Sequence, residues 1–434
     1  MQTGRILLQS MLWRGLYFVS AFVINILLAR HFQASVSGVV YYISSIYALV
    51  LLIASLSLES GIIYFSAKHE IPADRMFNSS IAWSFIIGLS TFFTVRFFFN
   101  KAYDGLPPDL IIISATFFIT GNLLITYCSA FFYAANNFII PNIIIITGTV
   151  ILIVLIPYNG QSVLPAITNQ NYFYLYFSIF LLQGLCMAAA ARLKFIKKTA
   201  FIFLSLKQFK ILFRYCARAF VANIIFFLLY RVDYFFVEKY CTPQALGNYI
   251  QVSKLVHLFF ILPTILASVV FPITAAGHND GIDKLLTLLS RLLFTVYMLA
   301  CILLAIIGKW LFPVVFGNSF SDMYLPFLCL MPGILSLSGI YTLAAYFAGK
   351  NRIVINIKGA VYALIVIVTG DLVFIPKYGI QAAAITSTAG YMVYQAYMIA
   401  VFKKEYQLAI ADFFVFKISD FIKIKSSIRG TFKK

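Results

Sequence analysis

Apolar runs of about twenty residues recur along the chain and are separated by short polar breaks. The hydrocarbon core of a bilayer is about 30 Å thick, so a helix needs roughly 20 apolar residues to cross it. The runs therefore predict membrane-spanning helices. We place about twelve of them, at residues 11–29, 39–58, 79–99, 110–134, 138–157, 172–191, 211–237, 246–271, 285–308, 324–348, 354–375 and 379–402.

The composition agrees with this class of protein. Hydrophobic residues make up 62% of the 434 residues, charged residues make up 11%, and the mean hydropathy is +0.94. Soluble domains are about half apolar and a quarter charged, and disordered chains lack the apolar residues needed to collapse. Both classes are excluded, and we expect an all-α polytopic membrane protein. The six cysteines show no CxxC pair or zinc spacing, so we expect no metal site.

The charge of the chain predicts its orientation. The net charge is +19, from 33 Lys and Arg against 14 Asp and Glu. A soluble protein with this surplus would suggest a nucleic-acid partner, but the positive-inside rule gives membrane proteins the same surplus. With twelve spans, most Lys and Arg fall on the side that carries both termini. We therefore expect both termini in the cytoplasm and no nucleic-acid partner.

Two basic segments lie outside the predicted spans, at residues 192–210 and 403–434. Both mix Lys with Phe, Ile and Leu, which is typical of helices that lie in the membrane interface. We interpret them as anchors to anionic lipid surfaces rather than as binding modules. They divide the chain into an N-lobe (1–191), a linker (192–210), a C-lobe (211–402) and a basic tail (403–434).

An internal repeat supports this division. Each of three segments in the first half has a similar segment in the second half, in the same order. Two homologous sets of six spans with one orientation would be related by a pseudo-two-fold axis along the membrane normal, with a substrate site between them. The matched pairs are LLARHFQASVSG (27–38) with FFVEKYCTPQALG (235–247), AFFYAANN (130–137) with AAYFAGKN (344–351), and IPYNG (156–160) with IPKYG (375–379).

Residues 231–254, RVDYFFVEKYCTPQALGNYIQVSK, resemble the seventh span and following loop of polysaccharide flippases in the multidrug/oligosaccharidyl-lipid/polysaccharide (MOP) exporter superfamily. The shared marks are an Asp inside the span and an L-G-x-Y motif that opens the next one. The AGK motif at 348–350 and IPKYGIQAAA at 375–384 are also similar. The chain departs from the family at residues 382–384, where Gly-Ala-Ala is usual. The resemblance covers essentially the whole chain.

The resemblance implies a fold like that of MATE (multidrug and toxic compound extrusion) transporters and other MOP proteins, and a transport function rather than an enzymatic one. Relatives that flip the peptidoglycan precursor usually have fourteen spans, so twelve favour the O-antigen or capsule branch. The implied substrate is an undecaprenyl-diphosphate-linked oligosaccharide, moved from the cytoplasmic to the periplasmic leaflet of the bacterial inner membrane by alternating access. Membrane lipids and other polysaccharide assembly proteins are the expected partners of a monomer. No bound cofactor is expected, and proton or sodium coupling stays open.

Moving a diphosphate through hydrocarbon requires a polar, preferably cationic cavity, and charges inside spans are costly unless they have a function. Arg14 in span one, and Arg214 and Arg218 on one face of span seven, are candidates for catching the diphosphate at the cytoplasmic mouth. The alternative is that these side chains snorkel to lipid phosphates.

A second group of charges is expected deeper in the C-lobe. We predict that Arg231 and Lys254 line the cavity and hold acidic sugar or phosphate groups, with Asp233 setting their geometry. A structural Asp233–Lys254 ion pair that locks two helices is an equal alternative. Asn25 occupies the position of Asp233 in the first repeat and is a further cavity candidate.

Glu59 near the end of span two is the main candidate for proton coupling, because a carboxyl group in apolar surroundings can carry a proton. Asp371 and His257 are weaker candidates for the same role. Alternatively, Glu59 accepts hydrogen bonds from a neighbouring Arg or caps the break before Gly61.

Two other functions compete with a flippase. A membrane enzyme of polysaccharide synthesis needs an acidic site on a long external loop, and the chain has no DxD pair and only short predicted loops. A cation-coupled multidrug exporter of the same superfamily would be expected to line its cavity with acidic residues. The surplus of Arg and Lys favours an anionic substrate. The sequence does not identify the sugar.

Overall fold

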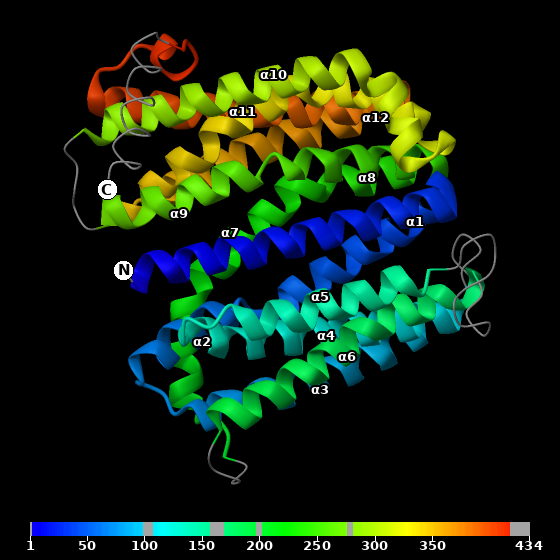
Figure 1. The fold of residues 1–434 in the computed structure, drawn as a ribbon, viewed down its shortest axis with the longest axis vertical. Coiled ribbons are helices and arrows are strands. Elements are labelled where there is room, and N and C mark those ends of the chain that lie inside the picture. The colour runs from blue at the N-terminus through cyan, green and yellow to red at the C-terminus, as the bar shows by residue number, and fades with distance from the viewer. Residues whose placement is uncertain (1, 99–106, 157–168, 197–201, 276–280, 417–434) are drawn as a thin grey trace. The chain divides into compact units, whose positions relative to one another are not determined.

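The computed structural model describes the chain except for residues 1, 99–106, 157–168, 197–201, 276–280 and 417–434 (Figure 1). All regular structure in the described part is helical, which confirms the expected all-α class. In chain order the elements are α1 (Gln2–Ser55), α2 (Leu58–Lys68), α3 (Ala73–Phe98), α4 (Pro108–Ala134), α5 (Ile139–Val154), α6 (Asn169–Phe195), α7 (Leu206–Tyr240), α8 (Pro243–Leu258), α9 (Ile261–Ala275), α10 (Ile282–Phe316), the short 3-10 helix η1 (Asn318–Met323), α11 (Tyr324–Gly349), α12 (Ile353–Tyr406) and η2 (Ile410–Phe413).

Within the described ranges, nine helical segments are long and apolar enough to cross a membrane. Two of the elements, α1 and α12, each contain two of the expected spans. In each element, one residue with non-helical backbone interrupts the helix near the boundary between the two spans. These residues are Gln33 (φ 61°) and Gly379 (φ 60°). The helical membrane fold is confirmed, whereas the count of twelve spans and the pseudo-two-fold symmetry stay predictions.

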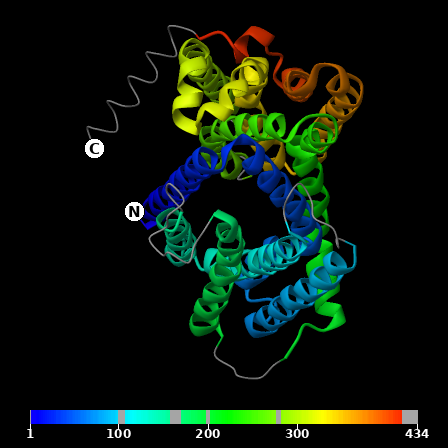
Figure 2. The same ribbon diagram turned by 90° about the vertical axis from the view of Figure 1, so that its right-hand side faces the viewer.

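The helices form two compact units, which we describe separately. Unit 1 contains residues 1–33 and 39–224, and unit 2 contains residues 34–38 and 225–434. In unit 1, α4 lies against α3 and α6, and in unit 2, α11 lies against α9, α10 and α12 (Figures 1 and 2). The boundary between the units falls inside α7.

The two basic segments are only partly described. The expected linker, 192–210, consists of the end of α6, the start of α7 and residues between them, of which 197–201 lie outside the described part. The expected tail is described as far as Phe416. The four-part division into lobes, linker and tail therefore stays a prediction.

Small residues allow close approaches between backbones in both units. In unit 1, a Cβ atom on Gly184 of α6 would lie 2.6 Å from the carbonyl oxygen of Gly121 on α4, so these helices pack backbone to backbone. In unit 2, a Cβ atom on Gly38 would lie 2.6 Å from the backbone nitrogen of Gly247. Gly38 and Gly247 are the equivalent last residues of the first matched pair of repeat segments.

The expected span at 246–271 differs from the observed structure, because it consists of two helices. The first, α8, ends at Leu258, and α9 begins at Ile261. Pro263 lies in the first turn of α9 and has no backbone N–H with which to continue the hydrogen bonds of α8. The break therefore comes a few residues before the proline.

Candidate functional site

A basic groove in unit 1 is formed by the first turns of α7 and by α2, and its volume is about 1040 Å³. Arg214 and Arg218, two of the predicted substrate-binding residues, both line this groove. Lys207 and Lys210 line it too, and Glu70 is an acidic residue at its edge. The lining residues therefore give the groove a clear surplus of positive charge.

The helical repeat of α7 places these cations on one face. Their positions, 207, 210, 214 and 218, are separated by three or four residues, which is the spacing of neighbours on a helix surface. The opposite face is apolar and buried at Leu212 and Cys216. Both pack on Gly61 of α2, where an added Cβ atom would lie 2.6 Å from Leu212 Cδ1. Burial of the apolar face therefore turns the charges toward the groove.

Aromatic rings form the α2 side of the groove. Tyr64 of α2 stacks on Tyr215 of α7, with ring centroids 4.5 Å apart and an interplanar angle of 25°. Lys68, at the end of α2, donates a hydrogen bond to the Tyr64 hydroxyl and lies 3.7 Å from the Glu70 carboxylate. The hydrogen bond to Tyr64 and the nearby Glu70 charge hold the pKa of Lys68 above its ordinary value. Lys68 therefore adds a further permanent positive charge beside the groove.

The segment that precedes α7 is attached to α3. The Ser79 hydroxyl accepts a hydrogen bond of 2.8 Å from the backbone N–H of Leu204. The Asn78 side chain donates to the carbonyl oxygen of Ile202 at 3.2 Å. These bonds fix the start of α7, and with it the positions of the first cations of the groove.

Glu59 lies in a polar cluster at the break between α1 and α2. Ser57 there has a left-handed backbone (φ 51°), and its hydroxyl accepts a hydrogen bond of 3.0 Å from Asn223 of α7. The Tyr127 hydroxyl donates to the carbonyl oxygen of Ser55 at 2.9 Å. Within the described residues, Glu59 Oε2 is buried without a hydrogen-bond partner. An unsatisfied buried carboxylate oxygen is a suitable place for a proton.

Arg14 and Asn25, the two predicted substrate-binding residues in the first half of the chain's N-lobe, both belong to α1. Arg14 belongs to α1, but its side chain lies outside the described part of the structure. The Asn25 side chain is half-buried and donates a hydrogen bond of 2.7 Å to the carbonyl oxygen of Ala21, one turn earlier. Their assignment to substrate binding stays a prediction.

In unit 2, Asp233 is buried and held by hydroxyl groups. Its carboxylate accepts hydrogen bonds from Tyr249 of α8 and, at 3.0 Å, from Ser387 of α12. The backbone N–H of Tyr234 donates to its other oxygen at 2.9 Å. The alternative of an Asp233–Lys254 ion pair stays a prediction. The hydroxyl bonds connect α7 to α8 and α12.

Asp371 lies close to Asp233 and is fully buried. The Thr386 hydroxyl donates a hydrogen bond to its Oδ1, whereas its Oδ2 is buried with no partner among the described residues. Asp371 and Asp233 are near enough to interact electrostatically, and Tyr249 interacts with both. The break in α12 at Gly379 brings Asp371 and Thr386 together. Two neighbouring buried carboxylates can share a proton or a cation.

The structure brings the predicted residues Arg231, Lys254 and His257 together in unit 2. Arg231 interacts electrostatically with both Lys254 and His257. The Arg231 guanidinium also lies 5.3 Å from the ring centre of Phe227. The Arg231 guanidinium keeps its charge and can bind an anion, and Lys254 and His257 place further nitrogen atoms beside it.

Tyrosines that the sequence did not single out lie beside this basic cluster. The Tyr230 ring lies 5.9 Å from His257 and 5.9 Å from Tyr391. The hydroxyl of Tyr394 is buried without a hydrogen-bond partner in the described part of the chain. Tyrosine rings and hydroxyls suit sugar faces and sugar hydroxyls. The sequence could not identify them, because nothing distinguishes these residues from the other tyrosines among 27.

Comparison with known proteins decides the family. A family model described as "Polysaccharide biosynthesis protein" matches residues 27–325. The chain belongs to this family. No curated protein gives a significant match in a sequence search.

Solved structures show which fold this family member has. A structure described as "Lipid II flippase MurJ, inward closed conformation" has a TM-score of 0.73 and 15% identity, and covers 95% of this chain and 89% of its own. An outward-facing multidrug resistance MATE family transporter has a TM-score of 0.65 and 13% identity, with coverages of 93% and 95%. A MOP superfamily transporter from Pyrococcus furiosus has a TM-score of 0.63, 13% identity and the same coverages. The chain therefore shares the fold of these three structures.

Sequence reasoning missed several groups at these sites. Lys207 and Lys210 belong to the cationic face of α7, and the sequence already shows their helical spacing to Arg214. Tyr64 and Tyr215 had no such signal, because their stacking depends on how α2 packs against α7. The pairing of Asp371 with Asp233 depends in the same way on the break in α12.

Proposed function

We propose that this protein flips an undecaprenyl-diphosphate-linked oligosaccharide, such as an O-antigen or capsule repeat unit, across the bacterial inner membrane. The observation that carries the proposal is the basic groove, with four cations on one face of α7, in a member of a polysaccharide biosynthesis family. Transport runs from the cytoplasmic to the periplasmic leaflet by alternating access, with both termini cytoplasmic. The protein works as a monomer beside other polysaccharide assembly proteins.

The groove suits the diphosphate. Arg214 and Arg218 offer planar guanidinium groups, which bind phosphate oxygens through paired hydrogen bonds. Lys207 and Lys210 add point charges, and the stacked Tyr64–Tyr215 pair offers ring edges and hydroxyls to the first sugar. The prenyl chain can stay in lipid while the diphosphate enters the groove, so only the polar part of the substrate needs a path.

The basic cluster in unit 2 would receive the head group in a later step. Arg231 presents a positive charge, Lys254 and His257 place further nitrogen atoms beside it, and the neighbouring tyrosines present hydroxyls and rings. This combination fits phosphate or acidic sugars better than it fits a cationic drug.

We propose that a gradient of protons or sodium ions across the membrane drives transport. Asp233 and Asp371 lie together with hydroxyls of Tyr249, Thr386 and Ser387, all of which offer oxygen to a proton or sodium ion. The partnerless Oδ2 of Asp371 is the atom at which the cation would bind. Glu59 in unit 1 is a second candidate for a proton. No other cofactor is proposed.

Exchange of Arg214 and Arg218 for Ala tests the proposal. We expect the double variant to lose most binding of the lipid-linked diphosphate in proteoliposomes and most export of polysaccharide from cells. Arg30→Ala is the matched control, because Arg30 is exposed and does not line the groove. Normal export by the double variant at wild-type expression would refute the role of the groove.

Cation-coupled export of a drug is the second candidate, and the buried Asp233–Asp371 pair is the observation that favours it. One efflux assay distinguishes the two functions. A cationic fluorescent compound should leave vesicles at equal rates with and without the protein if the substrate is an anionic lipid. Protein-dependent efflux of that compound would favour the exporter instead.

A further inference from the structure

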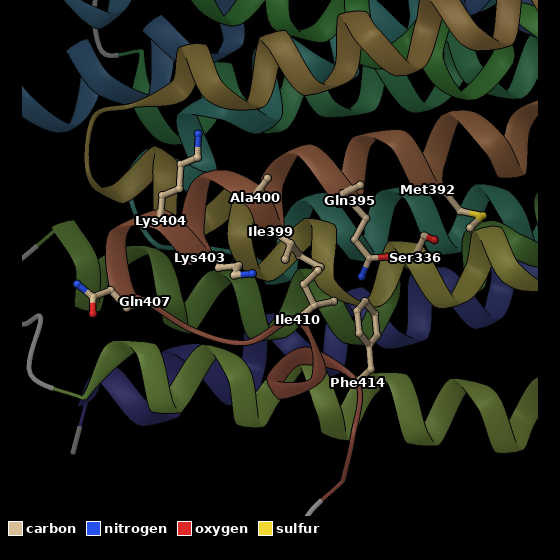
Figure 3. Close-up of a pocket in the computed structure, with 11 residues that line it drawn as sticks. Ser336, Met392, Gln395, Ile399, Ala400, Lys403, Lys404, Gln407, Ile410 and Phe414 are labelled. Atoms are coloured by element: carbon tan, nitrogen blue, oxygen red, sulfur yellow. The ribbon is translucent and has the colours of Figure 1, made fainter.

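An apolar groove in unit 2 follows one face of the second half of α12 and has a volume of about 590 Å³ (Figure 3). The α12 wall is formed by positions 392, 395, 396, 399, 400 and 403, which are separated by one or three residues. This spacing puts all six on a single helical face. Gln395 and Ser336 are buried polar residues that line the groove. The rest of this wall is apolar as far as Lys403.

The opposite wall comes from the segment after α12. Ile410 and Phe414 line the groove from this side. Arg291 of α10 is buried and donates a hydrogen bond of 2.7 Å to the carbonyl oxygen of Asp412, which fixes the segment to α10. The Phe413 ring packs on Phe402 of α12, with centroids 5.9 Å apart. These buried contacts attach the segment after α12 to α10 and α12, so the segment forms a fixed wall of the groove.

The length of the groove matches one lipid leaflet. Met392 and Lys403 mark its two ends along α12 and are eleven residues apart, which corresponds to about 16 Å of helix at roughly 1.5 Å per residue. One leaflet contributes about half of the roughly 30 Å hydrocarbon core. A single acyl chain of a phospholipid therefore fits this length, whereas a long polyprenyl chain exceeds it.

Positive charge is concentrated at one end of the groove. Lys403 and Lys404 line that end and are exposed. Among the described residues, neither forms an ion pair, because the neighbouring Glu405 binds Lys350 and Arg352 instead. Basic pockets between helices at the membrane surface attract the head groups of anionic lipids.

We propose that this groove binds one phospholipid with a singly charged anionic head group, such as phosphatidylglycerol. One acyl chain lies between α12 and the segment of Ile410 and Phe414. The phosphate contacts Lys403 and Lys404. This lipid is a bound partner and not the transported substrate. The cytoplasmic leaflet follows from the proposed orientation of the protein, but the binding itself does not depend on that orientation.

Retention of lipid by the purified full-length protein tests the proposal. The protein is placed in nanodiscs of equal parts phosphatidylglycerol and phosphatidylcholine, extracted, and analysed by native mass spectrometry. We expect one retained phosphatidylglycerol, with a preference over phosphatidylcholine of roughly tenfold, given two lysines near the phosphate. The Lys403→Gln/Lys404→Gln variant should lose this preference. Lys377→Gln, at an exposed lysine outside the groove, should keep it.

A second variant examines the acyl-chain part. Ala400→Phe should fill the groove and remove retention of either lipid, whereas Ile385→Phe, on the exposed surface of α12, should not. Equal retention of the two lipids by the wild type would overturn the proposal, as would unchanged preference in the lysine variant. Displacement of phosphatidylglycerol by equimolar undecaprenyl phosphate would also overturn it. Because no transport is measured, failure here leaves the flippase proposal intact.

Discussion

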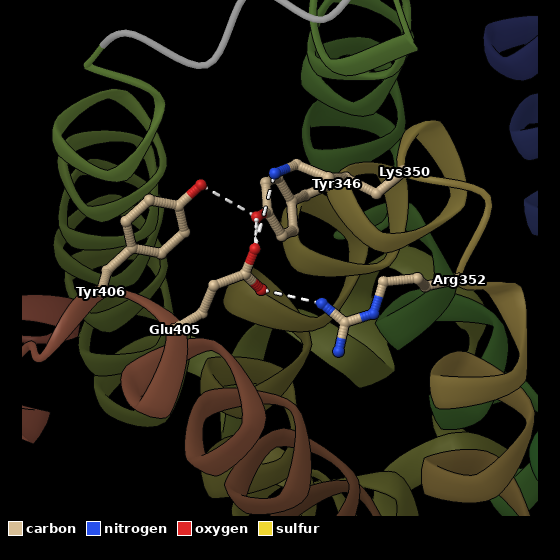
Figure 4. Close-up of polar contacts among 5 residues, drawn as sticks. All are labelled: Tyr346, Lys350, Arg352, Glu405 and Tyr406. Atoms are coloured by element: carbon tan, nitrogen blue, oxygen red, sulfur yellow. Dashed lines mark hydrogen bonds and ion pairs between the residues drawn. The ribbon is translucent and has the colours of Figure 1, made fainter.

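Arg352, which directly precedes α12, donates a hydrogen bond of 2.9 Å to the carboxylate of Glu405 at the far end of the same helix (Figure 4). Tyr346 donates to the other carboxylate oxygen at 2.7 Å, and Lys350 lies 3.5 Å from it. The two ends of α12 meet because the helix is broken at Gly379. Glu405 thereby joins the end of α11 to both ends of α12.

Exchange of Glu405 for Gln should lower the stability of the protein. We expect a loss of about 1 kcal/mol in the free energy of unfolding, because charge-assisted hydrogen bonds are lost but their partners remain partly exposed. Thermal unfolding in detergent measures the change. Glu70→Gln is the control, since its ion pair with Lys68 is 3.7 Å long and both side chains are about half exposed. Equal effects of the two variants would contradict a special role of Glu405.

Binding of the lipid-linked diphosphate in the basic groove should depend on the guanidinium group of Arg218 and on the ionic strength. Arg218→Lys keeps the positive charge but loses the planar fork that binds phosphate. We expect it to bind the lipid-linked diphosphate several-fold more weakly than the wild type, and Arg218→Ala to bind still more weakly. In both the wild type and the Lys variant, binding should weaken as salt increases, because salt screens exposed charges. Titrations in proteoliposomes at low and high salt provide the measurement.

The buried carboxylate pair predicts a loss of coupling. Asp371→Asn removes the charge at the partnerless oxygen while preserving its size and the acceptor for Thr386. We expect substrate flipping by this variant to become insensitive to sodium or to a pH gradient, whichever stimulates the wild type. Flipping measured in vesicles with each gradient in turn distinguishes the two.

A matched control for this coupling experiment is available in unit 1. Asp109 is 75% exposed and lies 3.8 Å from Arg96. Asp109→Asn should keep the full response to the gradient. If Asp371→Asn also kept the full response, Asp371 would be excluded from coupling, and Glu59→Gln would become the next variant to examine.

Much of the fold follows from the hydrophobic pattern. The expected spans at 110–134 and 324–348 lie within α4 and α11, because an apolar run of this length forms a helix in lipid whatever its neighbours are. The breaks between helices were harder to predict than the helices themselves. Pro263 signals the break between α8 and α9, but its effect appears several residues before it. Leu56 and Ser57 carry no glycine signal at all for their left-handed backbone.

The candidate site was predictable only where it lies on one helix. Arg214 and Arg218 share a face by helical spacing alone, so the sequence placed them together. Asp371 contacts Thr386 because α12 turns back at Gly379, and such contacts depend on tertiary packing. The hydroxyl partners of Asp233 on α8 and α12 depend on tertiary packing in the same way.

Gln33 is a strained residue whose replacement by Gly should stabilise the protein. Its backbone (φ 61°, ψ 175°) lies in a region that is essentially restricted to glycine, and the similar break in α12 is occupied by Gly379. We expect Gln33→Gly to raise the free energy of unfolding by about 1 kcal/mol, since relief of strain exceeds the entropy cost of glycine. Gln244→Gly, in the exposed first turn of α8, should lower it by roughly 0.5 kcal/mol instead. Thermal unfolding of both variants decides the point, because equal losses would mean that Gln33 stores no strain.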